Sequence, residues 1–257
     1  MTRIAVMGLG EAGRLYARGL AEAGADVTGY DPHVDVTGAG VAQYDRLQDC
    51  VDGADVVLSL VGARASVTAA RDAAAGMTGH AVLADLNAAA PDTKHRVARA
   101  VQESGVGMAD VAVLAPVPRA GHRTPLLASG EGAEAFAARM RPFGVPVDVA
   151  PGGVGDAARL KLLRAIFMKG LAAVTIEALE AGRALGAEDW LRGQIASELG
   201  SGGDALVERF VTGTRRHAER RAQEVGDALE MLAEAGAHDD VTRATHAWLR
   251  RILVEGD

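Results

Sequence analysis

A glycine-rich turn near the N-terminus constrains the fold more than any other feature of this sequence. Residues 8–13 read GLGEAG, which is the pattern GxGxxG. An apolar stretch precedes them at 2–7, and apolar residues at helical spacing follow them up to Gly24. A second apolar stretch then ends in Asp31 and a proline. This order predicts a strand, a tight turn, a helix and a second strand, which together form a βαβ unit.

Each glycine of this turn has its own physical role. Gly8 permits the tight turn, Gly10 lets the backbone approach a pyrophosphate, and Gly13 allows the helix to pack closely on the strand. The free amides at the start of the helix attract negative charge. Asp31, about twenty residues further on, can accept hydrogen bonds from ribose hydroxyls and repels a 2′-phosphate. We therefore expect NAD, with NADP less favoured. The alternative is that these glycines merely form a tight strand–helix turn, as in a methyltransferase or a cofactor-free relative. The candidate cofactor-binding residues are Gly8, Leu9, Gly10, Glu11, Ala12, Gly13, Asp31, Val61 and Asn87.

The rest of the chain changes from alternating strand and helix patterns to helical patterns alone. Strand-like apolar stretches at 55–61, 80–86, 106–113 and 145–149 alternate with helical patterns at 66–75, 91–103 and 131–141. Near-continuous apolar strands are typical of a parallel sheet covered on both faces, so we predict an α/β fold with a Rossmann-type, doubly wound, mostly parallel sheet. After residue 152 no strand is expected. Residues 155–183 read as one long helix, and further helices are separated at Gly186, 201–203 and Gly236. The predicted domains are 1–151, a dinucleotide-binding Rossmann domain, and 152–257, a smaller all-α domain for substrate binding and dimerisation.

Composition excludes several classes of function. The net charge is -7 and the pI is near 5.5, the wrong sign for coating nucleic acid or an anionic membrane. No apolar run approaches the roughly 18 residues of a membrane span, so a cytoplasmic protein is expected. Cys50 is the single cysteine, which excludes internal disulfides and all-thiolate metal sites. The histidines show no metal-ligand spacing, and no catalytic metal is expected.

Four segments, taken in order, resemble the β-hydroxyacid dehydrogenase family, which includes 3-hydroxyisobutyrate and 6-phosphogluconate dehydrogenases. They are the GLGEAG turn, Asp85–Pro91 (DLNAAAP), Asp110, and Gly152–Lys161 (GGVGDAARLK). The resemblance implies NAD(P)-linked oxidation of a β-hydroxy acid in a cleft between domains, with Lys161 as the general acid/base. The segment 161–170 resembles an uncharacterised bacterial branch of this family that carries a distinctive C-terminal helical domain.

Lysine is rare in this chain, which draws attention to Lys161. Only three of the 27 basic residues are lysines, at positions 94, 161 and 169. Moving a hydroxyl proton requires a group whose pKa lies near working pH, and a half-buried amine falls toward ~7 to 8 whereas arginine stays charged. On the long helix, apolar residues 160, 163, 167, 171 and 174 predict the face that holds the helix in its domain. Lys161 lies in a neighbouring stripe that is expected to face the cleft.

The sequence also departs from the family pattern. After Asp110 the chain lacks the serine and both glycines of the usual substrate loop, and Arg164 and Ala165 occupy the positions where the family has an asparagine. A proline-held loop at 116–125 carries cations that form either an anion clamp or an ordinary solvated loop. The candidate substrate residues are Pro116, Arg119, His122, Arg164 and His217.

Three readings of the function follow. The first is an NAD(P)-dependent dehydrogenase or reductase acting on a small β-hydroxy acid or a related carbonyl compound. The second is an imine reductase on the same fold, and the third is a catalytically silent dinucleotide-binding sensor or assembly protein. The apolar faces of the helical domain also predict burial against a second copy, as a homodimer.

Overall fold

A computed structural model of the chain describes residues 2–36 and 41–255. The chain divides into two compact units, Met1–Lys161 and Leu162–Asp257. The long helix α6 (Asp156–Ala184) contributes residues to both units. The two units divide between residues 161 and 162, inside α6. The domain boundary expected between residues 151 and 152 stays a prediction.

The first unit contains one sheet in the strand order β3-β2-β1-β4-β5-β6-β7-β8. Neighbouring strands are parallel, except that β7 runs antiparallel to β6. The strand order reverses at β1 and β4, which is where open α/β sheets bind ligands. The described strands are β1 (Arg3–Met7), β2 (Asp26–Tyr30), β3 (Ala42–Gln43), β4 (Val56–Ser59), β5 (Val82–Asp85), β6 (Gly107–Val113), β7 (Leu126–Ser129) and β8 (Val147–Val149).

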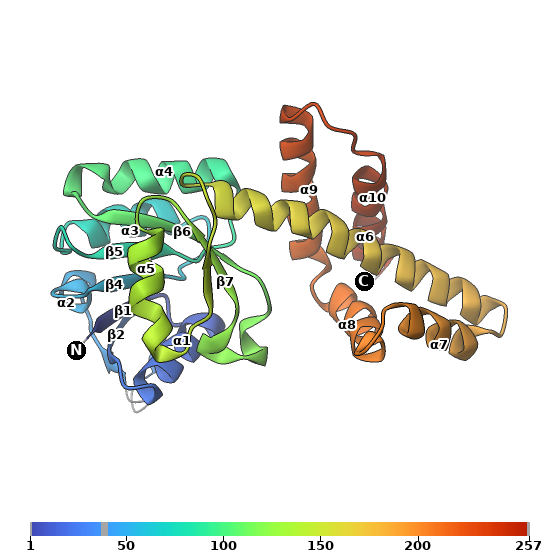
Figure 1. Cartoon of the computed structure of the whole chain (residues 1–257), viewed down its shortest axis with the longest axis horizontal. Coiled ribbons are helices and arrows are strands. Elements are labelled where there is room, and N and C mark those ends of the chain that lie inside the picture. The colour runs from blue at the N-terminus through green and yellow to red at the C-terminus, as the bar shows by residue number, and fades with distance from the viewer. Residues whose placement is uncertain (1, 37–40, 256–257) are drawn as a thin grey trace. The chain divides into compact units, whose positions relative to one another are not determined.

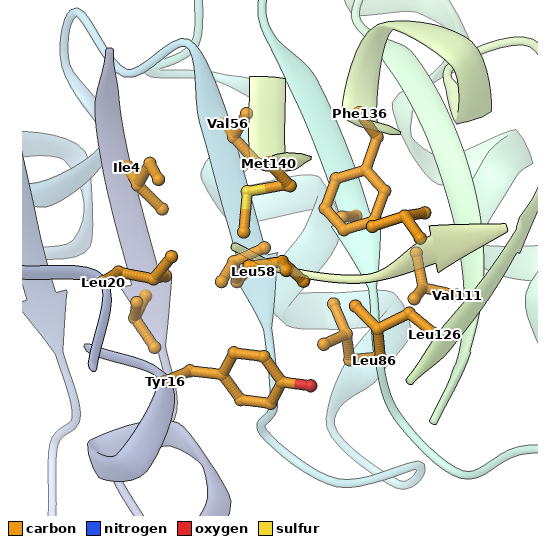
Figure 2. Close-up of a cluster of buried hydrophobic side chains, with 14 of the residues drawn as sticks. Ile4, Tyr16, Leu20, Val56, Leu58, Leu86, Val111, Leu126, Phe136 and Met140 are labelled. Atoms are coloured by element: carbon orange, nitrogen blue, oxygen red, sulfur yellow. The ribbon is translucent and has the colours of Figure 1, made fainter. Parts of the chain in front are cut away.

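Helices cover both faces of this sheet (Figure 1), because successive side chains of a strand point to opposite sides. Ile4 and Val6 of β1 join a core with α1 and α5, of which Figure 2 shows the central side chains. Ala5 and Met7 join a second core with α2, α3 and α4. The helices of this unit are α1 (Glu11–Glu22), α2 (Leu47–Val51), α3 (Ser66–Ala74), α4 (Pro91–Val101) and α5 (Ala133–Met140), with short 3-10 turns η1 (Gln102–Ser104), η2 (Val117–Arg119), η3 (Gly121–Arg123) and η4 (Arg141–Phe143).

The predicted α/β class with a mostly parallel sheet and a following helical region is confirmed. The predicted strands and helices of the first unit all occur, with ends that differ by a few residues. Five short elements were not predicted, namely α2, β3, β7 and the 3-10 turns η2 and η3. Each spans five residues or fewer, too short for a periodic pattern to be recognised.

All regular elements among the described residues of the second unit are helices. They are the remainder of α6, then α7 (Glu188–Glu198), α8 (Gly203–Arg216), α9 (Ala218–Glu234) and α10 (Asp240–Glu255). Ile176, Phe210, Val225, Trp248 and Leu249 form the centre of its core and come from α6, α8, α9 and α10. The breaks at Gly186, 201–203 and Gly236 occur as predicted, and a further break at His217 separates α8 from α9.

One prediction about α6 is wrong. Four of the five apolar residues expected to hold this helix in its domain are exposed: Leu160, Leu163, Phe167 and Val174 have 42%, 47%, 66% and 59% of their surface accessible. The fifth, Leu171, is half-buried and packs against the helical core as expected. The buried face instead carries many alanines, including Ala157, Ala158, Ala165, Ala172 and Ala173. Leu162, Ile176 and Leu179 of the same helix are also buried, so the buried face combines small and large apolar side chains.

Candidate active site

The glycine-rich turn has the geometry that its sequence predicts. Gly8 has a φ of +88°, and a Cβ there would lie 2.6 Å from the Leu60 carbonyl oxygen. A Cβ on Gly13 would lie 1.7 Å from the Gly8 carbonyl oxygen, so α1 packs against the turn at a distance that only glycine permits. Gly10 is different, since a Cβ there would meet no atom within 4 Å. The exposed backbone at Gly10 therefore offers the open approach that a pyrophosphate needs.

The other candidate residues of this turn differ in exposure. Leu9 is wholly buried in the core on the α1 side of the sheet, so it presents only its backbone. Glu11 is exposed and Ala12 is half-buried, both in the first turn of α1.

Asp31 follows β2 and is held by three backbone amides. Its Oδ2 accepts from Leu9 N at 2.7 Å, and its Oδ1 accepts from His33 N at 2.8 Å and Val34 N at 3.1 Å. These bonds fix the carboxylate beside the glycine-rich turn. A carboxylate has about four acceptor positions, so one remains for a hydroxyl.

The loop after β4 connects this turn with Asn87. Leu60 contacts the turn at Gly8, as described above, and Val61 is half-buried against the core on the other face of the sheet. Gly62 then donates its amide to Asn87 Oδ1 at 2.7 Å, while Asn87 Nδ2 donates to Ser59 Oγ at 3.0 Å. A continuous set of backbone and side-chain contacts therefore leads from the phosphate turn to Asn87.

A small pocket of the first unit brings Asn87 and Lys161 together. Asn87, Lys94, Asp110 and Lys161 line it, together with small apolar residues of the loop after β5, of β6 and of α6. Lys161 is half-buried there. Two residues separated by 74 positions in the sequence thus share one site, which combines an amide and a titratable amine in partly apolar surroundings.

Lys94 is a pocket residue to which the sequence analysis assigned no role. It is 1% exposed, and its Nζ lies 3.1 Å from Asp85 Oδ2 and 3.2 Å from Asp110 Oδ1. The rarity of lysine and the position of Lys94 in the first turn of α4, after a strand that ends in an aspartate, are the signals that mark it.

The loop between β6 and β7 holds three of the candidate substrate residues. Pro116 and Arg119 are exposed, whereas His122 packs against α1, where its Nδ1 would lie 2.1 Å from a Cβ on Gly19. Burial, with a smaller effect of Arg123, lowers the pKa of His122. None of these three residues is among those that line the pocket of Lys161. Their role in substrate binding stays a prediction.

Arg164 and His217 belong to the second unit. Arg164 is exposed on α6, and His217 is exposed at the junction of α8 and α9. Their proposed contact with substrate also stays a prediction.

The described residues contain neither a candidate metal centre nor a membrane-spanning helix. No group of three or more His, Cys, Asp or Glu side chains arranged to hold a metal ion occurs among residues 2–36 and 41–255. Over the same ranges, no helix has the length and apolar character needed to cross a membrane.

Two protein families match separate parts of the chain, one in the α/β part and one in the helical part. Residues 3–143 match the NAD binding domain of 6-phosphogluconate dehydrogenase. Residues 183–252 match a domain of unknown function, DUF1932. The glycine-rich turn, Asp31 and Asn87 lie within the first match.

Solved structures resemble the whole chain. A conserved hypothetical protein from Sinorhizobium meliloti 1021 is 29% identical with a TM-score of 0.78, covering 97% of this chain and 88% of that one. A Mycobacterium tuberculosis 3-hydroxyisobutyrate dehydrogenase with L-serine is 18% identical with a TM-score of 0.83, covering 99% and 94%. An imine reductase variant from Myxococcus stipitatus in complex with NAD+ is 19% identical with a TM-score of 0.71, covering 100% and 95%. The last two likenesses establish a shared fold and nothing more.

Proposed function

The chain belongs to the family of the NAD binding domain of 6-phosphogluconate dehydrogenase, and on that premise we propose that it is an NAD(P)-dependent oxidoreductase. The proposed reaction transfers hydride between nicotinamide and a small β-hydroxy acid or a related carbonyl compound. One observation carries the proposal: Lys161 and Asn87 line the same pocket, and Asn87 is joined through the loop after β4 to the glycine-rich turn.

The residues of the turn fit a dinucleotide. Gly10 leaves open space where a Cβ would stand, and the first amides of α1 supply positive potential for a pyrophosphate. The Asp31 carboxylate is fixed by three amides, so a ribose hydroxyl meets a preorganised acceptor and a 2′-phosphate meets a fixed negative charge. We therefore propose NAD as the preferred cofactor over NADP.

Lys161 is the proposed general acid/base. The nicotinamide of the bound cofactor supplies or accepts the hydride. In oxidation the neutral Lys161 amine takes the hydroxyl proton, and in reduction its ammonium returns a proton to the carbonyl oxygen. Both Nδ2 hydrogens of Asn87 are directed at Ser59 and Asp85, and its Oδ1 accepts the Gly62 amide. The remaining lone pair of Oδ1 can accept a hydrogen bond from a hydroxyl of ribose or substrate without reorganisation of the side chain.

Three lysine variants test the acid/base role. Lys161→Met removes the titratable amine, and Lys161→Arg keeps a cation that does not release its proton near neutral pH. We expect both to lose turnover while NADH binding stays near the wild-type affinity. Lys169→Met is the matched control, because Lys169 lies on the same helix, pairs with Glu224 at 2.6 Å and is absent from the pocket lining. Wild-type turnover in either Lys161 variant contradicts the assignment.

A substrate panel separates the competing functions. β-Hydroxy acids are assayed with NAD and with NADP, and aldehydes, keto acids and imines with the reduced cofactors. Turnover of hydroxy acids supports the proposal, whereas turnover confined to imines favours an imine reductase. Tight NADH binding without turnover of any compound favours a silent sensor or assembly protein.

We also propose that the protein is a homodimer. Leu163, Phe167 and Val174 recur along α6 at helical spacing and are 47%, 66% and 59% exposed. A row of large apolar side chains on one helix is typical of a surface that another chain covers. The proposed partner is a second copy of this chain, and light scattering measures the molar mass directly.

A further inference from the structure

A row of buried polar residues crosses the sheet beside the pocket. Ser59, Asp85, Asp110 and Ser129 are partners in register on β4, β5, β6 and β7. Each is at most 1% exposed. Buried charges persist in a protein only when they are paired and hydrogen-bonded, so this row requires a partner of opposite charge.

Lys94 supplies that charge. Its Nζ donates to the Asp85 carbonyl oxygen at 2.7 Å and forms ion pairs with Asp85 Oδ2 at 3.1 Å and with Asp110 Oδ1 at 3.2 Å. Three oxygen atoms therefore surround the ammonium, one as a hydrogen-bond acceptor and two as ion-pair partners. Lys94 joins two carboxylates that otherwise face each other as buried like charges.

Asp85 connects Lys94 with Asn87. Asp85 Oδ1 accepts the Asn87 backbone amide at 3.2 Å and is also hydrogen-bonded by Asn87 Nδ2. Because Asn87 Oδ1 accepts the Gly62 amide at 2.7 Å, the orientation of the Asn87 side chain and the path of the loop after β4 both depend on Asp85. We call this set of contacts the Asp85 arm.

Asp110 connects Lys94 with the start of α6. Asp110 Oδ2 accepts hydrogen bonds from the amides of Gly155 at 3.1 Å and Ala158 at 3.0 Å. Amides at a helix N-terminus have no partner within the helix, so Asp110 satisfies both. Lys161 lies one turn after Ala158 on the same side of the helix, so the anchored amides set its position. We call this set of contacts the Asp110 arm.

The charge balance favours this arrangement. One ammonium faces two carboxylates, and the Asp110 carboxylate also lies at the N-terminus of α6, where the helix dipole stabilises negative charge. Without Lys94 the two carboxylates would repel each other across neighbouring strands. Asp110 would then hold the start of α6, and Asp85 would hold Asn87, less firmly.

We propose that Lys94 is a positioning residue that holds Asn87 and Lys161 in register through Asp85 and Asp110. This inference rests on the proposed function of Asn87 and Lys161. We assign Lys94 no proton transfer, because it is 1% exposed and its Nζ is held by one hydrogen bond to the Asp85 carbonyl and by ion pairs with two carboxylates. Its effect on catalysis passes through the two arms.

Amide hydrogen exchange and turnover test the proposal together. In Lys94→Met we expect faster exchange at Gly62, Gly155 and Ala158, and a kcat lower by about 100-fold, the loss that a displacement of about 1 Å can cause. NADH affinity should fall by less than kcat, because the glycine-rich turn and Asp31 lie outside both arms. Lys169→Met is again the control, since it removes an ion-paired lysine from the other unit.

Two single-arm variants keep the test decisive if Lys94→Met does not fold. Asp110→Asn leaves an acceptor oxygen for α6 but loses charge assistance, which makes a hydrogen bond about twice as strong. It should accelerate exchange at Gly155 and Ala158 while Gly62 stays protected. Asp85→Asn should produce the opposite pattern. A general loss of stability would accelerate all three amides alike and leave kcat unchanged well below the unfolding temperature.

The outcomes distinguish the two proposals. If the wild type turns over none of the substrate panel, the proposed function fails, and the exchange pattern still tests the positioning role. If folded Lys94→Met retains wild-type kcat and wild-type exchange at these amides, the positioning role is overturned. The same holds if the two aspartate variants show no difference between the arms.

Discussion

The substitution Gly10→Ala separates cofactor binding from folding at the glycine-rich turn. Gly10 has φ −62° and ψ −162°, an extended conformation that alanine also adopts. A Cβ at this position would meet no protein atom within 4 Å. The added methyl group therefore occupies only the space through which a pyrophosphate would approach the backbone.

Two small opposing terms govern the stability of this variant. Replacing glycine at a compatible position stabilises a protein by about 0.4 to 1 kcal/mol through the unfolded state. Alanine is a poorer N-cap than glycine, and capping substitutions cost about 0.5 to 2 kcal/mol. We therefore expect the free energy of unfolding to change by no more than about 1 kcal/mol.

The effect on binding should be larger. A hydrogen bond to a charged group contributes about 1.5 to 3 kcal/mol, so losing one amide contact to the pyrophosphate weakens the Kd for NADH by roughly 10-fold to 150-fold. A fluorescence titration with NADH measures the Kd, and denaturant unfolding measures the stability of the same samples.

Two other glycine variants complete the experiment. Gly79→Ala is the matched control, since a Cβ there also meets no atom within 4 Å but the residue lies outside the turn. Gly13→Ala should instead destabilise the fold by at least about 1 to 3 kcal/mol, because its Cβ would overlap the Gly8 carbonyl oxygen. Wild-type NADH affinity in Gly10→Ala would refute the placement of the pyrophosphate at this turn.

Three further predictions concern other parts of the chain. Burial, with a smaller effect of Arg123, lowers the pKa of His122; the unfolded chain therefore binds the extra proton more readily, and stability falls as pH decreases below the ordinary histidine value. Denaturant unfolding at about pH 7 and about pH 5 should show a smaller loss in His122→Gln than in the wild type, and an equal loss would contradict this. Burial raises the pKa of the Cys50 thiol to about 11, so a chromogenic disulfide reagent should react slowly with the folded protein at neutral pH and rapidly after unfolding; rapid reaction of the native protein would speak against it. Phe167 is 66% exposed, and Phe167→Glu should yield monomers in light scattering if α6 forms the homodimer interface, whereas an unchanged molar mass would exclude that surface.

Local sequence patterns predicted most of the fold. Several glycines mark the ends of helices, as at Gly24, Gly186 and Gly236, each of which has a positive φ. The long helix and the main parallel strands were predicted because their apolar patterns are long enough to be recognised in the sequence. The strand β7 could not be found in this way, because its four residues form a strand only by pairing with β6 and β8.

The helical periodicity of α6 illustrates the same limit. The spacing of its apolar residues predicted a helix correctly, but the buried face is the one rich in alanine. Periodicity gives the angular position of each side chain, whereas the choice of the buried face depends on the shape of the neighbouring elements.

Some residues of the candidate site were found from local sequence patterns, and others only from the tertiary structure. The sequence by itself determined the glycine-rich turn and Asp31, because the spacing of a phosphate turn and a ribose acceptor is local to one βαβ unit. Only the tertiary structure decided that Asn87 and Lys161 share a pocket, and that Lys94 lies between Asp85 and Asp110. These contacts join residues from separate strands and helices. The charges of Lys94 on α4 and of Asp85 and Asp110 on the sheet can be buried only because the fold brings all three together.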